Sequence, residues 1–323
     1  MLHELISAID HRDNQLFRSL LHRCTSVPPV RTAICWPCNA VSLSGAMEAY
    51  EAGIIDPILV GPLLTIQQIA ASQDRDMSSY RIVDARSEEE AAAAAVQLCR
   101  SGDADALMKG SLHTDVMMHA ILNKERGLQT LKRVSHVFVM EAPLYDRPLL
   151  ITDAAINIYP TLMEKAGILQ NAIDLAHLMG ISRPKVAVLS AVETVCAAIT
   201  STLDAAALCK MADRGQIHGA EVDGPLAFDT AVSREAANLK QLRSSVAGQA
   251  DVLLVPDLEA GNMLAKQLEY LGAARLAGIV LGATVPIVLT SRADSTDARM
   301  ASCAIASLLV SHSRETAPST ISL

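Results

Sequence analysis

Short runs of aliphatic residues alternate along the chain with longer, alanine-rich stretches of helical periodicity. The short runs are rich in Val, Ile and Leu, which is typical of strands buried on both faces of a parallel sheet. Strands and helices alternating at this spacing predict an α/β fold with helices on both faces of its sheets, an αβα sandwich. The expected strands are Arg31–Cys35, Pro57–Val60, Tyr80–Asp84, Ala106–Lys109, His136–Glu141, Pro148–Thr152, Lys185–Ser190, Val252–Val255, Gly278–Leu281 and Pro286–Thr290.

The polar residues and glycines between these runs predict where the helices begin and end. Ser87–Glu90 stands before an alanine run and predicts a capping box at a helix start. Ser42–Ala52 and Tyr159–His177 are helical stretches that end before a glycine. Asp223–Asp229 carries a Gly-Pro pair and reads as a loop with a short apolar continuation.

The length of 323 residues suggests about two domains. A polar turn bounded by prolines at Pro143–Arg147 is a plausible boundary. The last strand and helix are too few to form a domain, so we expect them to return to the first sheet. Residues 1–147 and 286–323 are therefore predicted to form domain I, with residues 148–285 inserted as domain II.

Half of the residues are hydrophobic and the mean hydropathy is +0.27, which raises the question of a membrane segment. The apolar stretch Leu276–Ser291 is shorter than the roughly 20 residues a spanning helix needs, and it contains Pro286. The longer stretch Val186–Cys209 is interrupted by Glu193 and Asp204. The first ten residues include charged side chains, unlike a secretory signal. We therefore expect a cytoplasmic protein that does not enter a membrane.

The charge balance excludes another class of partner. The net charge is −8, from 27 basic and 35 acidic residues. This charge argues against binding of nucleic acid, because proteins that bind nucleic acid usually show a basic face. An acidic protein still binds an anion where positive charge is local. The partners expected are small molecules.

The seven cysteines are odd in number and scattered, which fits reduced thiols in a cytosol. Cys35 and Cys38 form a C-x-x-C, which leaves a redox pair, a zinc site or two incidental thiols as alternatives. A redox cysteine opens a helix whose N-terminus lowers its pKa, but here the helical pattern begins only near Ser42. The residue pattern therefore favours incidental thiols.

The segment after the fourth expected strand combines a cation, a glycine and hydroxyl groups. Lys109-Gly110-Ser111 leads through His113 and Thr114 into a helix expected over Val116–Asn123. A turn that enters a helix N-terminus offers backbone N–H groups to a phosphate. The alternative is an ordinary strand–turn–helix with a Ser or Thr cap.

The segment after the last expected strand contains one arginine among hydroxyls and carboxylates. Ser291, Arg292, Asp294 and Asp297 follow a strand end, where open α/β sheets bind ligands. Arginine binds phosphate bidentately, and a carboxylate beside it is a candidate base. A helix N-cap with acidic first-turn residues is the alternative.

A third strand end carries Asp257 and Asn262, either ligand-binding groups or a turn and a cap. No spacing of His or Cys indicates a metal site. The dinucleotide fingerprint G-x-G-x-x-G is also missing from the sequence.

Taken together, these segments resemble the phosphate acetyltransferase and phosphate butyryltransferase family. The resemblance runs in order from about residue 30 to 310 and is carried by four stretches: Ser42–Gly61, Ala106–Thr114, Val255–Asn262 and Thr290–Asp294. It implies a two-domain fold like that of isocitrate and isopropylmalate dehydrogenases, with an active site in the interdomain cleft. A homodimer is also implied.

The implied reaction is reversible acyl transfer between CoA and inorganic phosphate, by direct attack in a ternary complex. It uses CoA as a substrate and needs no metal, no cofactor and no covalent enzyme intermediate. The resemblance makes Arg292 the phosphate-binding residue and Ser291 a donor to the transition state. The base is an aspartate, Asp297 by spacing or else Asp294. Substrate-binding roles are expected for Lys109, Gly110, Ser111, His113, Thr114, Asp257, Asn262 and Asp294.

Three functions stay open at this point. An acetyl group is the favoured substrate, with butyryl as the alternative. An oxidoreductase on the same fold is a second possibility, although its paired aspartates and nicotinamide signature are not found. A catalytically inactive protein that binds CoA or acyl phosphate is the third.

Overall fold

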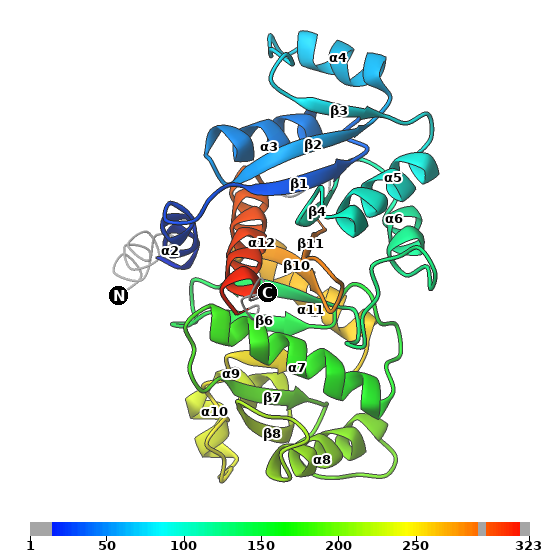
Figure 1. Ribbon diagram of the computed structural model, residues 1–323. Coiled ribbons are helices and arrows are strands. Elements are labelled where there is room, and N and C mark those ends of the chain that lie inside the picture. Colours follow the sequence, from blue (N-terminus) through cyan, green and yellow to red (C-terminus); the bar gives the residue numbers. More distant parts are fainter. Residues whose placement is uncertain (1–14, 290–294, 317–323) are drawn as a thin grey trace, which may run out of the picture. The chain divides into compact units, whose positions relative to one another are not determined.

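The computed structural model describes residues 15–289 and 295–316, which form two compact units (Figure 1). The N-terminal unit comprises residues 17–132 and the described residues after 277, and the central unit comprises residues 133–277 with residues 15–16. The divisions fall before Arg133 and after Ala277, earlier in the chain than the predicted boundaries at 147 and 285. The first division falls early because β5 (Ser135–Glu141) pairs with β6 (Leu149–Thr152) inside the central unit.

The N-terminal unit contains a mostly parallel sheet in the order β3-β2-β1-β4-β11. The last strand, β11, runs parallel to β4, although it lies almost 180 residues further along the chain. The end of β10 (Arg275–Leu281) pairs antiparallel with β11. The other strands are β1 (Val30–Cys35), β2 (Ile55–Gly61), β3 (Arg81–Asp84), β4 (Ala106–Lys109) and β11 (Ile287–Val288); the helices are α2 (Gln15–Cys24), α3 (Ala40–Glu51), α4 (Leu63–Ala71), α5 (Glu88–Ser101), α6 (Thr114–Ile121) and α12 (Thr296–Thr316).

The strand order reverses direction between β1 and β4. The chain moves outward from β1 through α3, β2 and α4 to β3, and then returns through α5 to β4. Because crossovers between parallel strands are right-handed, α3 and α4 cover one face and α5 the other. Helix α12 packs on α3, and α6 packs on α5 (Figure 1). The position between β1 and β4 is thus a topological switch point.

The aliphatic runs form the strands that the pattern predicts. Ile34, Leu59 and Leu107 lie in three neighbouring strands and are essentially inaccessible to solvent. Each of them is covered by helices on the faces of the sheet, which is why the runs show no polar alternation.

Helix starts differ from the expected ranges: α3 begins at Ala40 and α6 at Thr114, each two residues earlier than expected. Ser87 caps α5 by accepting from the N–H of Glu90, but the Glu90 carboxylate accepts from the N–H of Arg86. The predicted reciprocal box is therefore wrong by one residue. Helix α7 begins after Thr161, which forms a complete capping box with Glu164. The helix therefore starts three residues later than the expected start at Tyr159.

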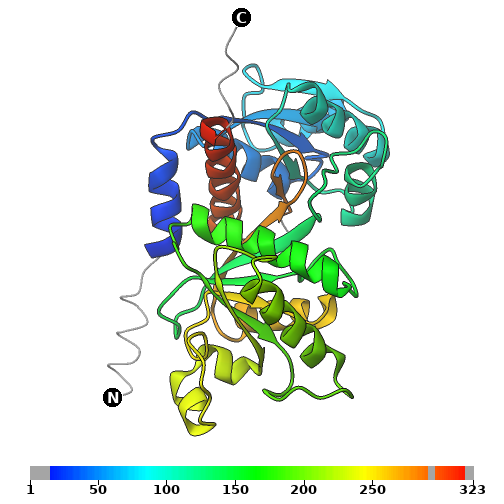
Figure 2. The same ribbon diagram turned by 60° about the horizontal axis from the view of Figure 1, so that its bottom comes forward.

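The strands of the central unit stand in the order β5-β6-β9-β7-β8 and are parallel from β6 to β8. Leu149 and Ile151 of β6 face a core shared with α9, α10 and α11, whereas Leu150 points to the opposite face. Figures 1 and 2 show α7 covering that opposite face. The remaining strands are β7 (Lys185–Leu189), β8 (Glu221–Leu226) and β9 (Val252–Leu254); the helices are α7 (Leu162–Leu178), α8 (Thr200–Asp213), α9 (Phe228–Val232), α10 (Arg234–Leu239) and α11 (Leu258–Tyr270).

Strand β8 lies in the segment that the sequence reads as a loop, and that prediction is wrong. Gly224 and Pro225 interrupt the aliphatic pattern, and Pro225 has no N–H to donate to a neighbouring strand. The strand stands last in the order of its sheet and pairs with β7. An edge position tolerates a proline that a central strand would not.

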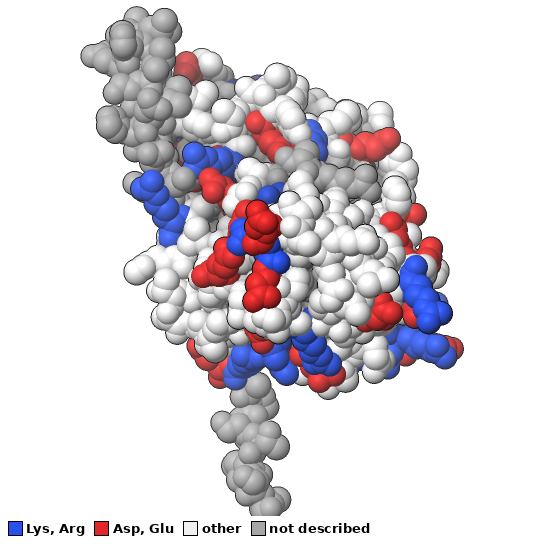
Figure 3. All heavy atoms as spheres, turned by 90° about the horizontal axis from the view of Figure 1, so that it is seen from above, with Lys and Arg blue, Asp and Glu red and all other residues white. Residues whose placement is uncertain are grey.

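The surface of the described residues carries both signs of charge. Lys and Arg side chains are interspersed with Asp and Glu on the face seen in Figure 3. Among the described residues, no helix combines the length and the apolar character that crossing a bilayer requires.

Candidate active site

The loops after β1 and β4 meet at the switch point, where open α/β sheets bind ligands. The N–H of Gly110 donates to the carbonyl of Cys35 at 2.8 Å, and the N–H of Ser111 donates to the carbonyl of Trp36 at 2.9 Å. The Ser111 hydroxyl donates to the same carbonyl at 2.9 Å and accepts from the N–H of Cys38 at 3.2 Å. Ser111 therefore holds the two loops together.

Close approach of the two loops explains the glycine. A Cβ atom on Gly110 would lie 2.5 Å from the carbonyl oxygen of Trp36 and 2.6 Å from that of Cys35. Trp36 itself has a φ of 58°, in the left-handed region that bulky residues rarely adopt. Such backbone conformations persist where the surroundings impose them, commonly at functional sites.

A buried cation and a carboxylate face this edge. Lys109 is only 6% exposed, and its ammonium donates to the carbonyl of Gly110 at 3.3 Å. Burial, together with the Glu88 charge, raises the pKa of the Cys35 thiol to about 12, and the Lys109 charge opposes that rise. The charges of Lys109 and Glu88 thus both influence Cys35, in opposite directions.

Helix α6 starts at this edge. Its N-cap, His113, and its first residue, Thr114, are both exposed to solvent. The N–H of His113 donates to the Glu88 carboxylate at 3.1 Å. Glu88 is therefore a site residue that the sequence reasoning missed, because the residue was assigned only to the capping of α5.

Strand β11 ends at the same edge of the N-terminal unit. Strand β11 pairs in parallel with β4, with Ile287 opposite Leu107 and Val288 opposite Met108, so the two strands end side by side. Asp297 lies in the first turn of α12 and is exposed. The other predicted residues of this loop, Ser291, Arg292 and Asp294, lie outside the described residues.

A second arginine, which the sequence reasoning did not single out, lies in the first turns of α12. Arg299 is 7% exposed and donates to the hydroxyl of Thr296 at 3.3 Å. Its side chain packs over Gly45 of α3, where a Cβ atom would lie 2.7 Å from the arginine Nε. A buried guanidinium therefore lies just past the loop of predicted catalytic residues.

The C-x-x-C pair has the properties of two protonated thiols. Burial, reinforced by the Glu88 charge, raises the pKa of Cys38 to about 11. Cys35 lies inside β1, and helix α3 begins only at Ala40, after the Asn39 cap. Neither thiol is at a helix N-terminus, which would favour a thiolate.

Replacing Cys38 by alanine is therefore expected to leave acyl transfer within about twofold of wild type, since no thiolate forms there near pH 7. Steady-state rates measured beside a Cys196→Ala control check this. A loss of activity confined to Cys38→Ala would restore a chemical role for the pair.

The third predicted group lies in the central unit, where β6 and β9 end at one edge of the sheet. Asp257 caps α11 by accepting from the N–H of Ala260 at 2.8 Å. The Asn262 side chain donates to the carbonyl of Ala154, just after β6, at 3.2 Å. Gly261 permits this contact, because its Cβ would lie 2.9 Å from that of Ala154. Both predicted binding residues thus have structural partners.

Beside them lies a buried carboxylate that the sequence reasoning missed. Asp153 is 3% exposed and accepts from the backbone N–H groups of His136, Ala155 and Ile156. It also accepts from the side chain of Asn157 at 2.5 Å. Asp153 therefore joins the end of β6 to β5. No side-chain motif could reveal it, because the donors are mostly backbone groups.

The His136 side chain lies in the same buried region and predicts a pH dependence. Burial lowers its pKa to about 4, and the nearby Asp153 charge opposes that shift. Because the folded-state pKa lies below the unfolded value, the stabilisation is complete above about pH 6.5 and declines as the pH falls toward 4.

We expect the free energy of unfolding to fall by up to about 2 kcal/mol from this group between pH 7 and pH 5. Urea unfolding at both pH values tests this, with His136→Phe expected to lose that part of the dependence. An unchanged pH dependence in the variant would contradict it.

Within the described ranges, no group of three or more His, Cys, Asp or Glu side chains is arranged to hold a metal ion. The chemistry available at the switch point comes instead from a buried ammonium, backbone N–H groups and hydroxyls. Fold and site together define an α/β protein whose N-terminal unit is suited to a small anionic ligand.

Comparison with known proteins identifies the family. Residues 88–307 match the family described as phosphate acetyl/butaryl transferase. The phosphate acetyltransferase of Rhizobium meliloti is 56% identical over 286 residues, which cover 88% of this chain and 90% of that protein. The phosphate butyryltransferase of Clostridium beijerinckii is 43% identical over 298 residues, covering 92% and 99%. The chain belongs to the phosphate acetyltransferase and phosphate butyryltransferase family and is an acyltransferase.

A solved structure supports the same assignment. The branched-chain phosphotransacylase of Enterococcus faecalis V583 is 30% identical, with a TM-score of 0.76. The alignment covers 87% of this chain and 99% of that structure. The predicted two-domain α/β fold class is thereby confirmed.

Proposed function

We propose that the protein catalyses the reversible transfer of a short acyl group, acetyl first, between CoA and inorganic phosphate. The products in one direction are an acyl phosphate such as acetyl phosphate and free CoA. The observation that carries the proposal is the parallel pairing of β4 with β11, which makes these two strands end side by side at one sheet edge in a chain of this family.

The chemistry asks for three kinds of group. The CoA thiol has to lose its proton before sulfur attacks the acyl carbon, and a carboxylate base serves this step. The negative charge that develops on the carbonyl oxygen needs hydrogen-bond donors. The bond from the acyl carbon to the phosphate oxygen then breaks, and phosphate leaves with the bonding electrons.

The residues are assigned to these steps as follows. Asp297, exposed at the start of α12, takes the thiol proton, with Asp294 as the alternative. Ser291 donates to the carbonyl oxygen and Arg292 binds the phosphate. Lys109 adds a positive charge at the switch point, supported by the N–H groups at the start of α6.

The remaining substrate-binding assignments are of two kinds. Ser111 fixes the loop of Gly110 against β1, while His113 and Thr114 present exposed groups beside it. Asp257 and Asn262 belong to the central unit and are proposed to contact the substrate as well as cap and anchor α11.

The acyl preference follows from the stronger likeness to a relative named for acetyl than to one named for butyryl. Two methylene groups change binding by only about 1–3 kcal/mol, so butyryl transfer at a lower rate is expected. The protein is further proposed to be a cytoplasmic homodimer that needs neither a metal nor a cofactor, with CoA entering only as a substrate.

The test measures purified protein with acetyl-CoA and butyryl-CoA in the presence of phosphate, and with the two acyl phosphates in the presence of CoA. Transfer in both directions, faster with acetyl, is the expected result. CoA binding without turnover would support the inactive binding protein instead, and nicotinamide-dependent turnover would support an oxidoreductase. Sedimentation of the same sample determines the oligomeric state.

A further inference from the structure

Arg299 contacts the first turn of α12 with both its backbone and its side chain. Its N–H donates to the carbonyl of Ser295 at 3.1 Å, and its guanidinium donates to the hydroxyl of Thr296 at 3.3 Å. Ser295 also caps the helix, because its hydroxyl accepts from the N–H of Ala298 at 3.2 Å. Arg299 therefore holds both residues that come directly before Asp297, the proposed base.

Arg299 and Asp297 lie on opposite sides of this turn. Asp297 is exposed, whereas Arg299 is only 7% exposed. Successive residues of an α-helix are about 100° apart around its axis, so positions two apart point about 200° from each other. Burial of the arginine thus directs the carboxylate outward. A rotation of this turn would change the direction of the carboxylate by the same angle.

The arginine side chain occupies space that a glycine of α3 leaves open. Gly45 is buried in the interior of that helix, and a Cβ atom on it would lie 2.7 Å from the Nε of Arg299 and 3.0 Å from its Cδ. Glycine is unfavourable in a helix interior, because its backbone loses more conformational freedom than that of alanine. Helix α3 therefore contains an unfavourable residue at the place where Arg299 needs room.

The rest of α12 has anchors of its own. The Ser302 hydroxyl donates to the carbonyl of Ala298 at 2.7 Å and accepts from the N–H of Gly278 at 3.0 Å. At the other end of the helix, Arg314 forms an ion pair with Asp105 at 2.8 Å. Loss of the Arg299 side chain would therefore alter the first turn and leave the body of the helix in place.

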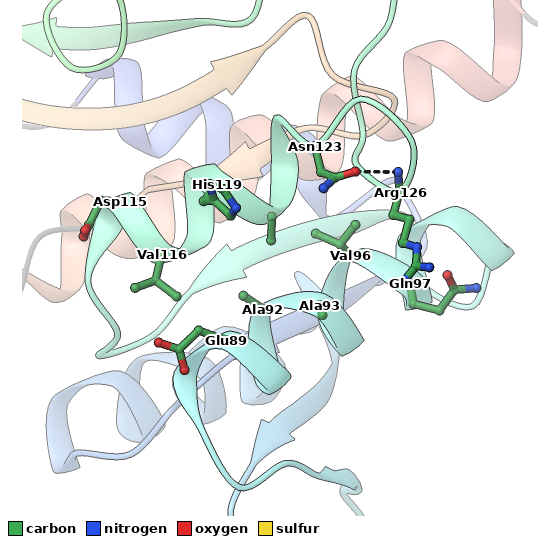
Figure 4. A pocket seen from close by; sticks show the side chains of 11 residues that line it. Glu89, Ala92, Ala93, Val96, Gln97, Asp115, Val116, His119, Asn123 and Arg126 are labelled. Carbon is green, nitrogen blue, oxygen red and sulfur yellow. Dashed lines mark hydrogen bonds between the residues drawn. The ribbon is translucent and has the colours of Figure 1, made fainter.

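The pocket shown in Figure 4 lies away from this turn. Helices α3 and α12 pack together on one face of the sheet of the N-terminal unit, and α5 covers the other face. The pocket is lined by residues of α5, of α6 and of the turn after α6 (Figure 4). A replacement of Arg299 is therefore expected to leave that pocket unchanged, so that an effect on the rate is separable from an effect on binding.

We propose that Arg299 is a positioning residue for acyl transfer, which fixes the first turn of α12 so that the Asp297 carboxylate faces the reacting groups. This role rests on the proposed function, in which Asp297 takes the proton of the CoA thiol. Arg299 itself takes no part in a bond that forms or breaks. Its effect is large because misplacing a reacting group by about 1 Å lowers a rate by about 100-fold.

The first test separates rate from binding. Arg299→Ala is expected to lower kcat at least about tenfold, with the KM values for CoA and phosphate within about twofold of wild type. Arg299→Lys, which keeps the charge and most of the length, is expected to have a kcat between the two. Arg314→Ala, at the far end of the same helix, is the matched control and is expected to keep the wild-type kcat. Raised KM values with an unchanged kcat in Arg299→Ala would overturn the positioning role.

The second test displaces the arginine from the opposing helix, and it also covers the case in which Arg299→Ala does not fold. Gly45→Ala pushes the arginine aside but introduces a better helix former, so kcat is expected to fall several-fold while the urea midpoint stays near the wild-type value. In the Arg299→Ala background the same glycine replacement is expected to leave kcat unchanged. A wild-type kcat for Gly45→Ala, or an equal fall in both backgrounds, would overturn the positioning role.

The third test asks whether Arg299 acts through Asp297. Asp297→Asn removes the proposed base, so adding Arg299→Ala to it is expected to leave the residual kcat unchanged. A further fall of about tenfold in the double variant would overturn the positioning role. Full activity of Asp297→Asn would reject Asp297 as the base, and the positioning role with it, but leave acyl transfer standing. A wild-type protein without acyl transfer would instead overturn the proposed function.

Discussion

Replacing Gly110 by alanine is expected to lower the free energy of unfolding by about 3 kcal/mol and to remove most of the acyl transfer activity. The added Cβ would lie 2.5 and 2.6 Å from two backbone carbonyl oxygens of the loop after β1. Backbone atoms cannot rotate away as a flexible side chain does, so the two loops have to separate. Separation breaks the hydrogen bonds by which Ser111 joins them.

Urea unfolding and steady-state rates of Gly110→Ala measure both effects. Gly53→Ala is the control, because Gly53 has a φ of 71° but no heavy atom lies within 4 Å of the place where its Cβ would stand. The control is expected to lose about 1 kcal/mol from backbone strain alone and to keep its activity. An equal loss of stability in the two variants would show that close approach at Gly110 is unimportant.

Replacing Lys109 by methionine is expected to lower kcat/KM for phosphate roughly 100-fold, because the buried ammonium lies at the switch point and donates to the carbonyl of Gly110. A positive charge in a poorly solvated position acts on a phosphate more strongly than one at the surface. Methionine has a similar length and leaves the packing of β4 largely intact.

Kinetics in both directions test this prediction, with circular dichroism to verify folding. The KM for CoA is expected to change little, because the ammonium acts on the phosphate. Lys210→Met removes an exposed surface charge with a 65% exposed side chain and serves as the control. A uniform fall for both substrates would mean that Lys109 supports the fold and not the phosphate.

Much of the architecture could be predicted from the order of residues. Ten of the described strands fall within or beside the expected runs, because strands buried on both faces need uninterrupted aliphatic residues. The exception was β8, whose Gly224-Pro225 pair is tolerated because the strand lies at the edge of the sheet. Whether a strand lies at an edge depends on its neighbours in space, so the sequence pattern did not predict β8. The division between the two compact units falls earlier than the expected boundary because β5 and β6 pair with each other.

Some residues of the candidate site could be predicted from the sequence and others could not. Lys109, Gly110 and Ser111 could be found because a cation, a glycine and a hydroxyl follow a strand in sequence. Glu88 and Asp153 could not, because their partners are backbone N–H groups of other elements. Hydrogen bonds to the backbone leave no side-chain pattern to read.

The sequence alone determined the α/β fold class, since hydrophobic periodicity is a property of neighbouring residues, and its local motifs gave the resemblance to the acyltransferase family. The tertiary structure decided which of those motifs come together. Parallel pairing of β4 with β11 joins segments almost 180 residues apart at one edge, and the Ser111 bonds join the loops on either side of the switch point. Such pairings depend on strand order and crossover handedness, which no local pattern of residues encodes.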